Sequence, residues 1–499
     1  MRITNKIMQN NSLYNLNNNK ILQDKLNTQM STYKKITKPS DDPVIAIRAL
    51  RLRSTLSEVT QLYEKNIPDA ASWLEVTEGA ISSITDIVED LIDKTRDGSN
   101  GKLETNDRLK IVEQMKSLRD EIYATGDADY AGRSLFTGYR TGTKLRFQED
   151  TTAHYKITES LTKAAIDTIM YVDKAGIEAV NTTNYDTTVI TEQQISSANI
   201  DRIRLAYGEL DDVIPTFTYV DDNGTTQTIT PTVSSSTDQA YRDMAAVNAG
   251  NPVEEKAIFI AETGEMLLSD SLSEKLQALS KTAEISVTYE KTNWNRGNLR
   301  PEHYFVCEDF TNNMVYETPS SEQEIEYSVG FNQRLRINST AGEVYTHDIG
   351  RDVDELVKLS QQVIDLESLV STLESVVEAE TDETKKIAAQ KNLDAANKAL
   401  TLLRDEQLQF AFENGITAMQ GYLEQTTLAI TNCGTRSARL ELVEARLQTQ
   451  QTSFKSLVSE NEDVDITEVA IQFESSQTAY NAALMATGKV VQNSLLDFL

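Results

Sequence analysis

Two ladders of apolar residues, each repeating at alternating intervals of three and four, constrain the fold of this chain more than any other feature. The ladders are Ala70, Leu74, Thr77, Ile81, Ile84, Val88, Leu91 and Leu356, Leu359, Val363, Leu366, Val370, Leu373, Val377. This interval places every listed side chain on one stripe of an α-helix, and such a stripe needs a partner helix. We therefore expect the regions near the two ends of the chain to pack side by side.

The middle of the chain has a different texture, rich in threonine, aromatic residues and turn signals. Residues 216–229, with Asp222-Asn223-Gly224 at their centre, predict a β-hairpin. Residues 160–175 and 265–280 are predicted to be helical. The predicted fold class is therefore α+β: a mainly α rod, built as a coiled-coil-like bundle from both chain ends, with a central mixed, mainly β inserted domain.

Three parts of the chain follow from this pattern. Residues 1–43 and 455–499 are predicted to be terminal polymerisation helices, residues 44–145 and 350–454 a helical rod domain, and residues 146–349 a β-rich outer domain. For the inner helices, a closed bundle and packing against other subunits remain equally open alternatives.

The terminal helices are more polar than the inner ones, so they bury too little apolar surface to order themselves alone. We expect their apolar residues to form the contact between subunits: Leu22, Leu26, Tyr33, Ile36, Phe473, Tyr480, Leu484, Val491 and Phe498.

Pro39, Ser40, Asp41, Asp42 and Pro43 interrupt the first helix, because proline lacks an amide donor and disfavours helix at the preceding residue. This segment predicts a hinge. Ser40 or Asp41 is expected to cap the next helix, with Pro43 in its first turn. A later proline, Pro68, predicts either a kink or two helices placed end to end.

Charge and hydropathy exclude several classes of partner. The 499 residues carry a net charge of -29, although residues 1–65 contain eleven Lys or Arg against five Asp or Glu. Acidic chains bind nucleic acid and anionic membranes poorly, so neither partner is expected. No segment has the roughly 18 apolar residues that a membrane span needs. The opening residues do not resemble a secretory signal peptide, so we expect any export to proceed without one.

Residues capable of catalysis or metal binding are scattered. His154, His303 and His347 are isolated from one another, and Cys307 and Cys433 lack a second ligand nearby. The sequence contains no phosphate-binding glycine loop and no nucleophile motif. We therefore expect no catalytic residues, no metal and no cofactor, and we do not expect an enzyme. An enzymatic or ligand-binding module within residues 146–349 is the minor alternative.

The terminal regions resemble the flagellin superfamily of bacterial axial proteins. The resemblance covers residues 1–145 and 350–499, and it rests on short motifs combined over that length: Pro39–Pro43, Ile45–Ser54, Asn66, Asp69-Ala70, Ser72–Leu74, Glu78–Ala80, Gly132–Gly138, Arg436–Leu447 and Ala482–Leu499. The opening Met1–Lys6 and the Ser-Leu-Phe-Thr-Gly ending are most similar to members that join hook to filament. Filament flagellin is the near alternative.

The resemblance implies an extracellular structural protein of the flagellum, exported without a cleaved signal through a type III apparatus. It also implies partners: further copies of the chain in a ring or helical array, a hook-associated protein on the hook side, flagellin on the filament side, and a cytoplasmic export chaperone.

Overall fold

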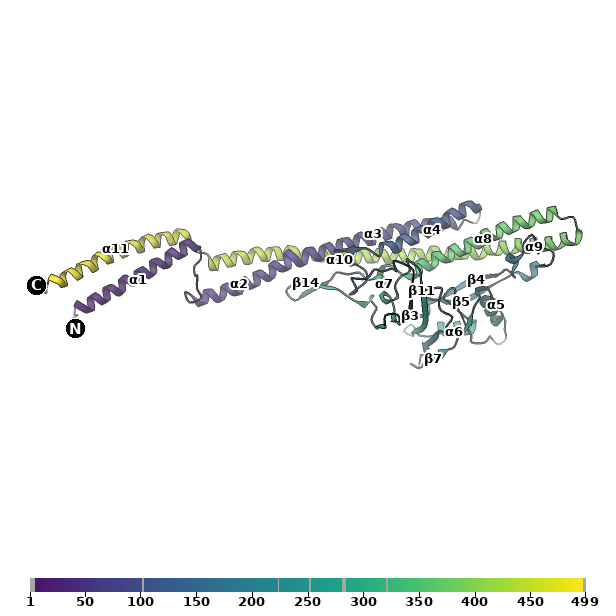
Figure 1. Cartoon of the computed structure of the whole chain (residues 1–499), viewed down its shortest axis with the longest axis horizontal. Coiled ribbons are helices and arrows are strands. Elements are labelled where there is room, and N and C mark those ends of the chain that lie inside the picture. The colour runs from purple at the N-terminus through teal and green to yellow at the C-terminus, as the bar shows by residue number, and fades with distance from the viewer. Residues whose placement is uncertain are drawn as a thin grey trace. The chain divides into compact units, whose positions relative to one another are not determined.

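Two compact units make up the chain in its computed structural model (Figure 1), which describes residues 5–100, 103–222, 224–250, 253–280, 284–319 and 322–496. The terminal unit comprises Met1–Ala71, Tyr327–Leu335 and Ala438–Leu499. The central unit comprises Ser72–Glu326 and Arg336–Ser437. Long helices from both chain ends and sheets in the middle give the α+β class that the sequence predicts.

The terminal unit is almost entirely helical. Helix α1 lies along α11, although the two are separated by more than 400 residues of sequence. A small two-stranded sheet, β14-β15, also belongs to this unit. The elements are α1 (Asn5–Thr32), α2 (Pro43–Gln61), the π-helix η1 (Leu62–Asn66), the start of α3 (Ile67–Gly98), β14 (Glu326–Gly330), β15 (Gln333–Arg336), the end of α10 (Gln409–Glu462) and α11 (Ile466–Leu496).

The central unit combines helices with two larger sheets. Its helices are α3, α4 (Thr105–Thr125), α5 (Thr237–Asn248), α6 (Asp270–Gln277), α7 (Ala341–Val344), α8 (His347–Ala379), α9 (Glu383–Thr401), the π-helix η7 (Leu402–Leu408) and α10. Helix α8 packs along α9 and α4. Helix α3 packs on α10, where the Cys433 Sγ lies 3.5 Å from the carbonyl oxygen of Leu74.

Both apolar ladders are buried, as their spacing predicts. All seven ladder residues of α3 have an exposed fraction of 0%, and six of the seven in α8 are buried. Helix α10 lies against both α8 and α3: a side chain at Gly415 would touch Leu356 of the α8 ladder and Thr95 of α3, one turn beyond its ladder. Helices α3 and α8, which are distant in sequence, therefore both pack against α10.

The six-stranded sheet has the order β13-β12-β3-β11-β6-β7 and is antiparallel throughout. Its strands are β3 (Thr151–Leu161), β6 (Thr216–Val220), β7 (Thr226–Ile229), β11 (Ile285–Trp294), β12 (Val306–Asp309) and β13 (Met314–Tyr316). Strands β6 and β7 form the hairpin predicted over residues 216–229. A short pair, β1 (Asp129–Tyr130) and β2 (Arg133–Ser134), precedes this sheet in the chain.

The five-stranded sheet has the order β4-β5-β10-β9-β8, and only its β8–β9 pair is parallel. Its strands are β4 (Ile166–Asp173), β5 (Ser196–Arg204), β8 (Thr232–Ser234), β9 (Ala257–Ile260) and β10 (Glu265–Leu268). Every residue of β9 and β10 is buried, because one face of this sheet meets the six-stranded sheet and the other is covered by α5.

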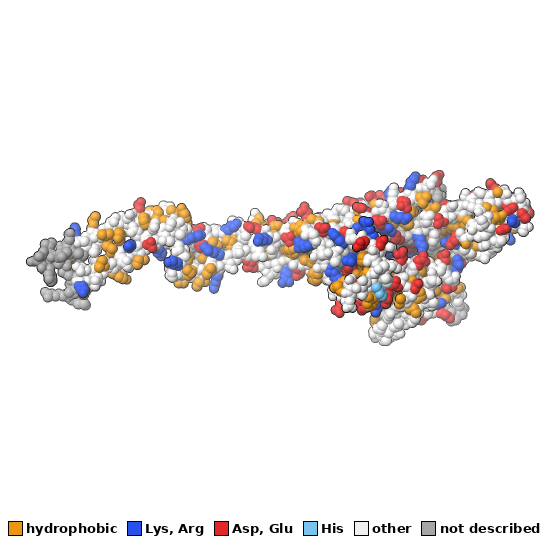
Figure 2. Space-filling view, in the orientation of Figure 1, with side chains coloured by type: hydrophobic (Ala, Val, Ile, Leu, Met, Phe, Trp, Pro, Cys, Tyr) orange, Lys and Arg blue, Asp and Glu red, His pale blue; other side chains and the backbone are white. Residues whose placement is uncertain are grey.

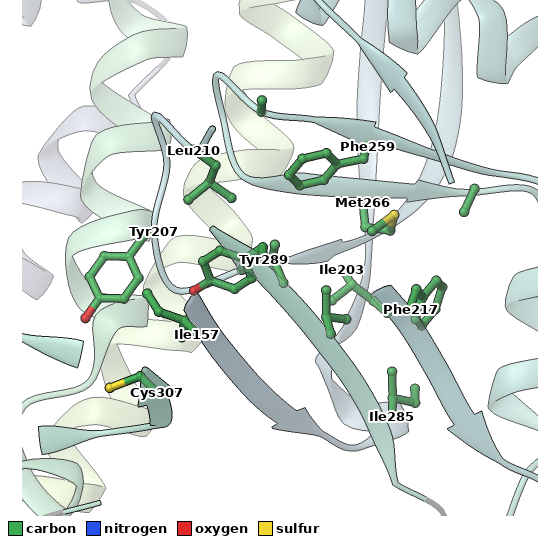
Figure 3. Packing of buried hydrophobic residues seen from close by; sticks show 14 of the residues in the cluster. Ile157, Ile203, Tyr207, Leu210, Phe217, Phe259, Met266, Ile285, Tyr289 and Cys307 are labelled. Atoms are coloured by element: carbon green, nitrogen blue, oxygen red, sulfur yellow. The ribbon is translucent and has the colours of Figure 1, made fainter. Parts of the chain in front are cut away.

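The main core lies between the two sheets (Figure 3). Ile157, Phe217 and Ile285 of the six-stranded sheet point towards Ile203 and Met266 of the five-stranded one. Side chains alternate between the faces of a strand, so each sheet contributes every second residue to this layer.

The helices predicted over residues 160–175 and 265–280 are corrected by the structure. Residues 166–173 form β4, whose partner β5 lies about 30 residues further along the chain, and residues 265–268 form β10. Only the second half of the latter segment is helical, as α6. Short apolar runs do not distinguish a buried strand from a buried helix, and here long-range pairing decides between them.

Candidate assembly interface

Helices α1 and α11 meet along a regular but polar seam, which we call the α1–α11 seam. The partly buried positions of α1 recur at intervals of three and four, as in a coiled coil. Between residues 9 and 26 they are Gln9, Ser12, Leu16, Asn19, Gln23 and Leu26. Leu26, with an exposed fraction of 3%, is the only large apolar side chain of the described part of α1 that is fully buried.

The facing side of α11 follows the same interval. Its partly or fully buried positions are Val469, Phe473, Ser476, Tyr480, Ala483 and Thr487, with Ala470 beside the first of them. Burial of one leucine contributes about 1.5–3 kcal/mol, whereas ordering one residue of backbone costs about 1–2 kcal/mol. A helix of 28 residues with so little apolar burial therefore gains little from its partner alone.

Apolar side chains occupy the opposite side of both helices. Ile7, Tyr14 and Ile21, with exposed fractions of 50, 67 and 61%, recur at intervals of seven. In α11, Ile471 and Met485 are 65 and 73% exposed. Each of these five residues lies two positions from a seam residue, which corresponds to a rotation of about 200° around the helix. The exposed row of α1 and that of α11 therefore point away from each other, on opposite faces of the helix pair, and we call these five residues together the outer stripe.

Figure 2 shows apolar side chains distributed over the surface of this helix pair. Monomeric proteins leave single apolar residues exposed without consequence, but an aligned row of them is typical of an interaction surface. The outer stripe therefore has the geometry of helix surfaces that meet no partner among the residues the structure describes.

A further apolar surface lies on α2. Val44, Ile47 and Leu50 are 67, 55 and 66% exposed, and the exposed cations Arg48 and Arg51 lie between and beside them. This surface therefore combines apolar contact area with positive charge.

The two linkers that meet at one end of the helix pair, after α1 and before α11, are joined by a charged clamp. Lys34 and Asp463 form an antiparallel bridge, and their side chains pair at 2.5 Å. The side chain of Glu462 is 4% exposed and accepts from Arg53 Nε at 2.5 Å. The Arg53 guanidinium and Lys34 lower the pKa of Glu462 below its ordinary value, and Lys34 lowers the pKa of Asp463. Both carboxyls are therefore held ionised.

Helix α1 ends earlier than the proline motif predicts. Its last residue is Thr32, and Tyr33 adopts a left-handed φ of 58°. The cap of α2 is Asp42, which accepts from the amides of Val44 and Ile45, rather than Ser40 or Asp41. Asp41 accepts instead from the amides of Thr37 and Lys38 within the linker.

Pro39, Ser40 and Pro43 are exposed, and Pro43 is the first residue of α2, as predicted. Pro68 is the second residue of α3, and α2 and α3 follow each other end to end through a π-helical turn. The π-helical turn η1 directly precedes it, and the amide of Ile67 donates to the carbonyl oxygen of Leu62. The extra residue in this turn displaces the carbonyl that the proline ring would otherwise meet.

The predicted contact residues fall into three groups. Leu22, Leu484 and Tyr33 are exposed, at 47, 47 and 56%. Leu26, Phe473 and Tyr480 lie in the α1–α11 seam, and Ile36 is half-buried in the linker. Val491 lies in α11 with its side chain outside the described residues, and Phe498 lies outside them altogether.

Sequence reasoning missed the outer stripe. Its signal was present in the seven-residue interval between Ile7, Tyr14 and Ile21. Hydrophobic periodicity is normally assigned to the side of a helix that packs against its partner. In α1 the apolar residues at this interval lie on the side away from α11, so the pattern was not assigned to a second contact surface.

The described residues also bear on metal and membrane binding. No cluster of three or more His, Cys, Asp or Glu side chains suited to a metal ion occurs within the ranges that the structure describes. No described helix combines the length and the apolar composition that crossing a membrane requires. Cys307 and Cys433 are buried free thiols.

Long terminal helices, a polar internal seam and an outer apolar stripe are features typical of subunits of larger assemblies. Comparison with known proteins shows which proteins this chain resembles. Residues 3–141 match the family model of the bacterial flagellin N-terminal helical region.

Flagellar hook-associated protein 3 of Salmonella typhimurium is 30% identical over 142 residues, which are 28% of this chain and 44% of that protein. The protein of the same name from Escherichia coli K12 is 29% identical over 144 residues, or 29% of this chain and 45% of that protein. The matched segment thus spans less than half the length of these curated relatives.

A solved structure of the flagellar junction protein from Legionella pneumophila aligns with 84% of this chain and all of its own, at 11% identity and a TM-score of 0.29. A flagellin of Clostridium tyrobutyricum is 25% identical over 143 residues, 28% of this chain and 38% of that protein.

Proposed function

We propose that the protein is a structural component of the bacterial flagellum and assembles as a junction ring between hook and filament. The observation that carries this proposal is the outer stripe on a helix pair whose own seam is polar. Matches to two flagellar hook-associated proteins support the junction over other flagellar positions.

Assembly follows from the balance of ordering and burial. Neighbouring copies that cover the outer stripe remove five large apolar side chains from water, at about 1.5–3 kcal/mol for each one fully buried. The contact is between different surfaces of successive subunits, which generates rings or helical arrays. The predicted contacts of Leu22 and Leu484 extend the same surface.

The partners are other copies of the chain, a hook-associated protein on the hook side and flagellin on the filament side. A cytoplasmic chaperone covers the terminal helices before export through the type III apparatus. The protein acts as an extracellular structural element, without catalytic chemistry.

A triple substitution, Ile7→Gln, Tyr14→Gln and Ile21→Gln, tests the stripe because glutamine keeps the helix propensity and removes the apolar surface. Purified protein is added to isolated hooks, and electron microscopy counts the capped hooks. We expect the number of capped hooks to fall at least about tenfold, because a tenfold weaker association corresponds to a loss of only about 1.4 kcal/mol of binding free energy.

Leu428→Gln and Ile387→Gln form the control, because both residues are at least half exposed on helices of the central unit. The control variant should cap hooks normally. Capping by the triple variant at the level of the unchanged protein would refute the role of the stripe.

Filament flagellin remains the second candidate, supported by the flagellin match. Antibody labelling of intact flagella separates the two. Label confined to the hook-proximal end of the filament supports a junction, whereas label along the whole filament supports flagellin.

A further inference from the structure

A polar pocket of about 620 Å³ lies in the central unit and shares no residue with the proposed assembly surface. Helix α4, the first turns of α8, the turn at residues 206–209 and the loop at residues 295–299 form its walls. Its volume falls within the range of small-molecule sites, about 300–1,000 Å³.

Two cations converge on one turn in this pocket. Lys291 is 2% exposed, and its Nζ donates to the carbonyl oxygens of Gly208 and Glu209 at 2.8 and 2.9 Å. Arg351 donates to the carbonyl oxygen of Thr263 and lies beside Gly208, where an added Cβ would be 3.0 Å from Arg351 Nη1.

The side-chain hydrogen bonds of these two cations within the described residues go to backbone carbonyl oxygens. Burial lowers the pKa of Lys291 to about 8 and lowers the pKa of Arg351. Buried charges are normally paired, so two cations whose hydrogen bonds go to backbone carbonyls mark a place where an anion is favoured.

Buried polar atoms without a partner line the same wall. His347 Nε2 and Arg351 Nε are fully buried and have no hydrogen-bond partner in the described part of the chain. The two residues are four apart on α8, so they share one face of the helix. Both line the pocket.

The remaining walls carry acceptors and amides. Glu209 accepts from Asn295 at 3.1 Å, and Glu262 accepts from Thr237 at 2.9 Å. Carboxylates have several lone-pair sites, so each can also accept from a hydroxyl group. Arg119 and Asp354, which also line the pocket, pair with each other and neutralise their charges.

We propose that this pocket binds a sugar acid, whose carboxylate lies at Arg351, His347 and Lys291 and whose hydroxyl groups donate to Glu209 and Glu262. A ligand with one carboxylate and several hydroxyls places one negative charge beside the two cations and brings no second negative charge near the acidic wall. The proposal is independent of the assembly surface.

The test uses the full chain and isothermal titration calorimetry with galacturonate, galactose, acetate and inorganic phosphate as separate probes. We expect saturable binding of galacturonate with a millimolar or lower Kd, and at least tenfold weaker binding of the three other probes. Arg351→Gln should weaken galacturonate binding by about tenfold or more, because it removes a charge-assisted contact.

Arg242→Gln is the matched control, since Arg242 pairs with Asp173 in the same unit and does not line the pocket. It should bind galacturonate normally. Circular dichroism melting establishes that each variant is folded. If Arg351→Gln is unfolded, Arg296→Ala, at an exposed position of the pocket, takes its place and should weaken binding measurably.

Three outcomes would overturn the proposal. The unchanged protein fails to bind galacturonate, phosphate or acetate binds as tightly as galacturonate, or the folded pocket variant binds as well as the control. Phosphate binding as tight as that of galacturonate would show that the pocket binds small anions without selecting a sugar acid.

Discussion

At the scale of single residues, Glu462 holds the linkers of the terminal unit together. It is buried, accepts from Arg53 and lies 3.4 Å from Lys34. Glu462→Gln keeps the shape and removes the charge. We expect the terminal unit to lose about 1 kcal/mol of stability, because the partners are largely exposed and their pairs are screened. Amide exchange at residues 33–36 and 462–464 measures the loss.

Glu468→Gln is the control for this substitution, because Glu468 is exposed and accepts only from Gln472 among the bonds of its side chain in the described residues. Unchanged exchange in Glu462→Gln would show that the backbone bridge alone holds the linkers.

The same clamp predicts a pH dependence. The cations lower the pKa values of Glu462 and Asp463 from their ordinary values of 4.5 and 3.8. A carboxyl with a lowered pKa stabilises the fold above its ordinary pKa and loses that effect as the pH falls through the lowered value. Exchange of the linker amides should therefore be constant from about pH 8 to about pH 5, after correction for intrinsic rates, and should accelerate below about pH 4.5. A constant corrected rate down to about pH 3 would contradict the clamp.

At the scale of elements, two glycines in the helices of the central unit should respond in opposite directions to alanine. A Cβ at Gly98 would lie 2.6 Å from the ring of Phe412, whereas a Cβ at Gly434 meets no atom within 4 Å. Gly98→Ala should cost about 1–3 kcal/mol through overpacking. Gly434→Ala should raise the free energy of unfolding by about 0.5–1 kcal/mol, because alanine loses less conformational entropy than glycine when it enters a helix. Urea denaturation measures both changes, and equal signs would refute the packing described at α3 and α10.

The π-helical turn before Pro68 predicts that this proline is tolerated. Pro68→Ala should change the free energy of unfolding by less than about 1 kcal/mol, since the turn already accommodates the ring. Ala71→Pro, three residues later in the regular helix, should cost about 3 kcal/mol. Denaturant titrations of the two variants test this contrast, and a large loss in Pro68→Ala would show that the proline itself shapes the turn.

Local sequence signals predicted those elements whose apolar pattern is strong. The α3 ladder and the hairpin of residues 216–229 are examples. Residues 166–173 were mistaken for helix because their strand is defined by pairing with β5, which no local pattern records. The cap of α2 was misplaced by one residue, since Ser40, Asp41 and Asp42 can all cap and only the backbone conformation selects Asp42.

At the scale of the whole molecule, the terminal helices should be separable from the rest of the fold. Deletion of residues 1–38 or of residues 460–499 should leave a folded, soluble protein that no longer joins hook to filament. Circular dichroism melting tests the fold, and capping of isolated hooks tests assembly. Normal capping by either truncated protein would contradict the proposed role of the helix pair.

The overall class could be predicted from the sequence, whereas the candidate site could be predicted only in part. Leu22 and Leu484 are exposed as a contact surface requires, whereas Leu26, Phe473 and Tyr480 are already engaged within the chain. The difference arises because Gln9, Asn19 and Gln23 occupy positions that hydropathy assigns to solvent. The pocket at Lys291 and Arg351 could not be predicted from the sequence, because its residues are distant along the chain and come together only in the tertiary fold.

The polar seam between α1 and α11 has a consequence for the proposed export of this chain. When the helices separate, water hydrates the glutamine, asparagine and serine side chains of the seam. Separation of the two helices therefore exposes little additional apolar surface. Their renewed pairing requires the removal of water from few apolar side chains. The α1–α11 helix pair can therefore separate and form again without aggregation of the chain.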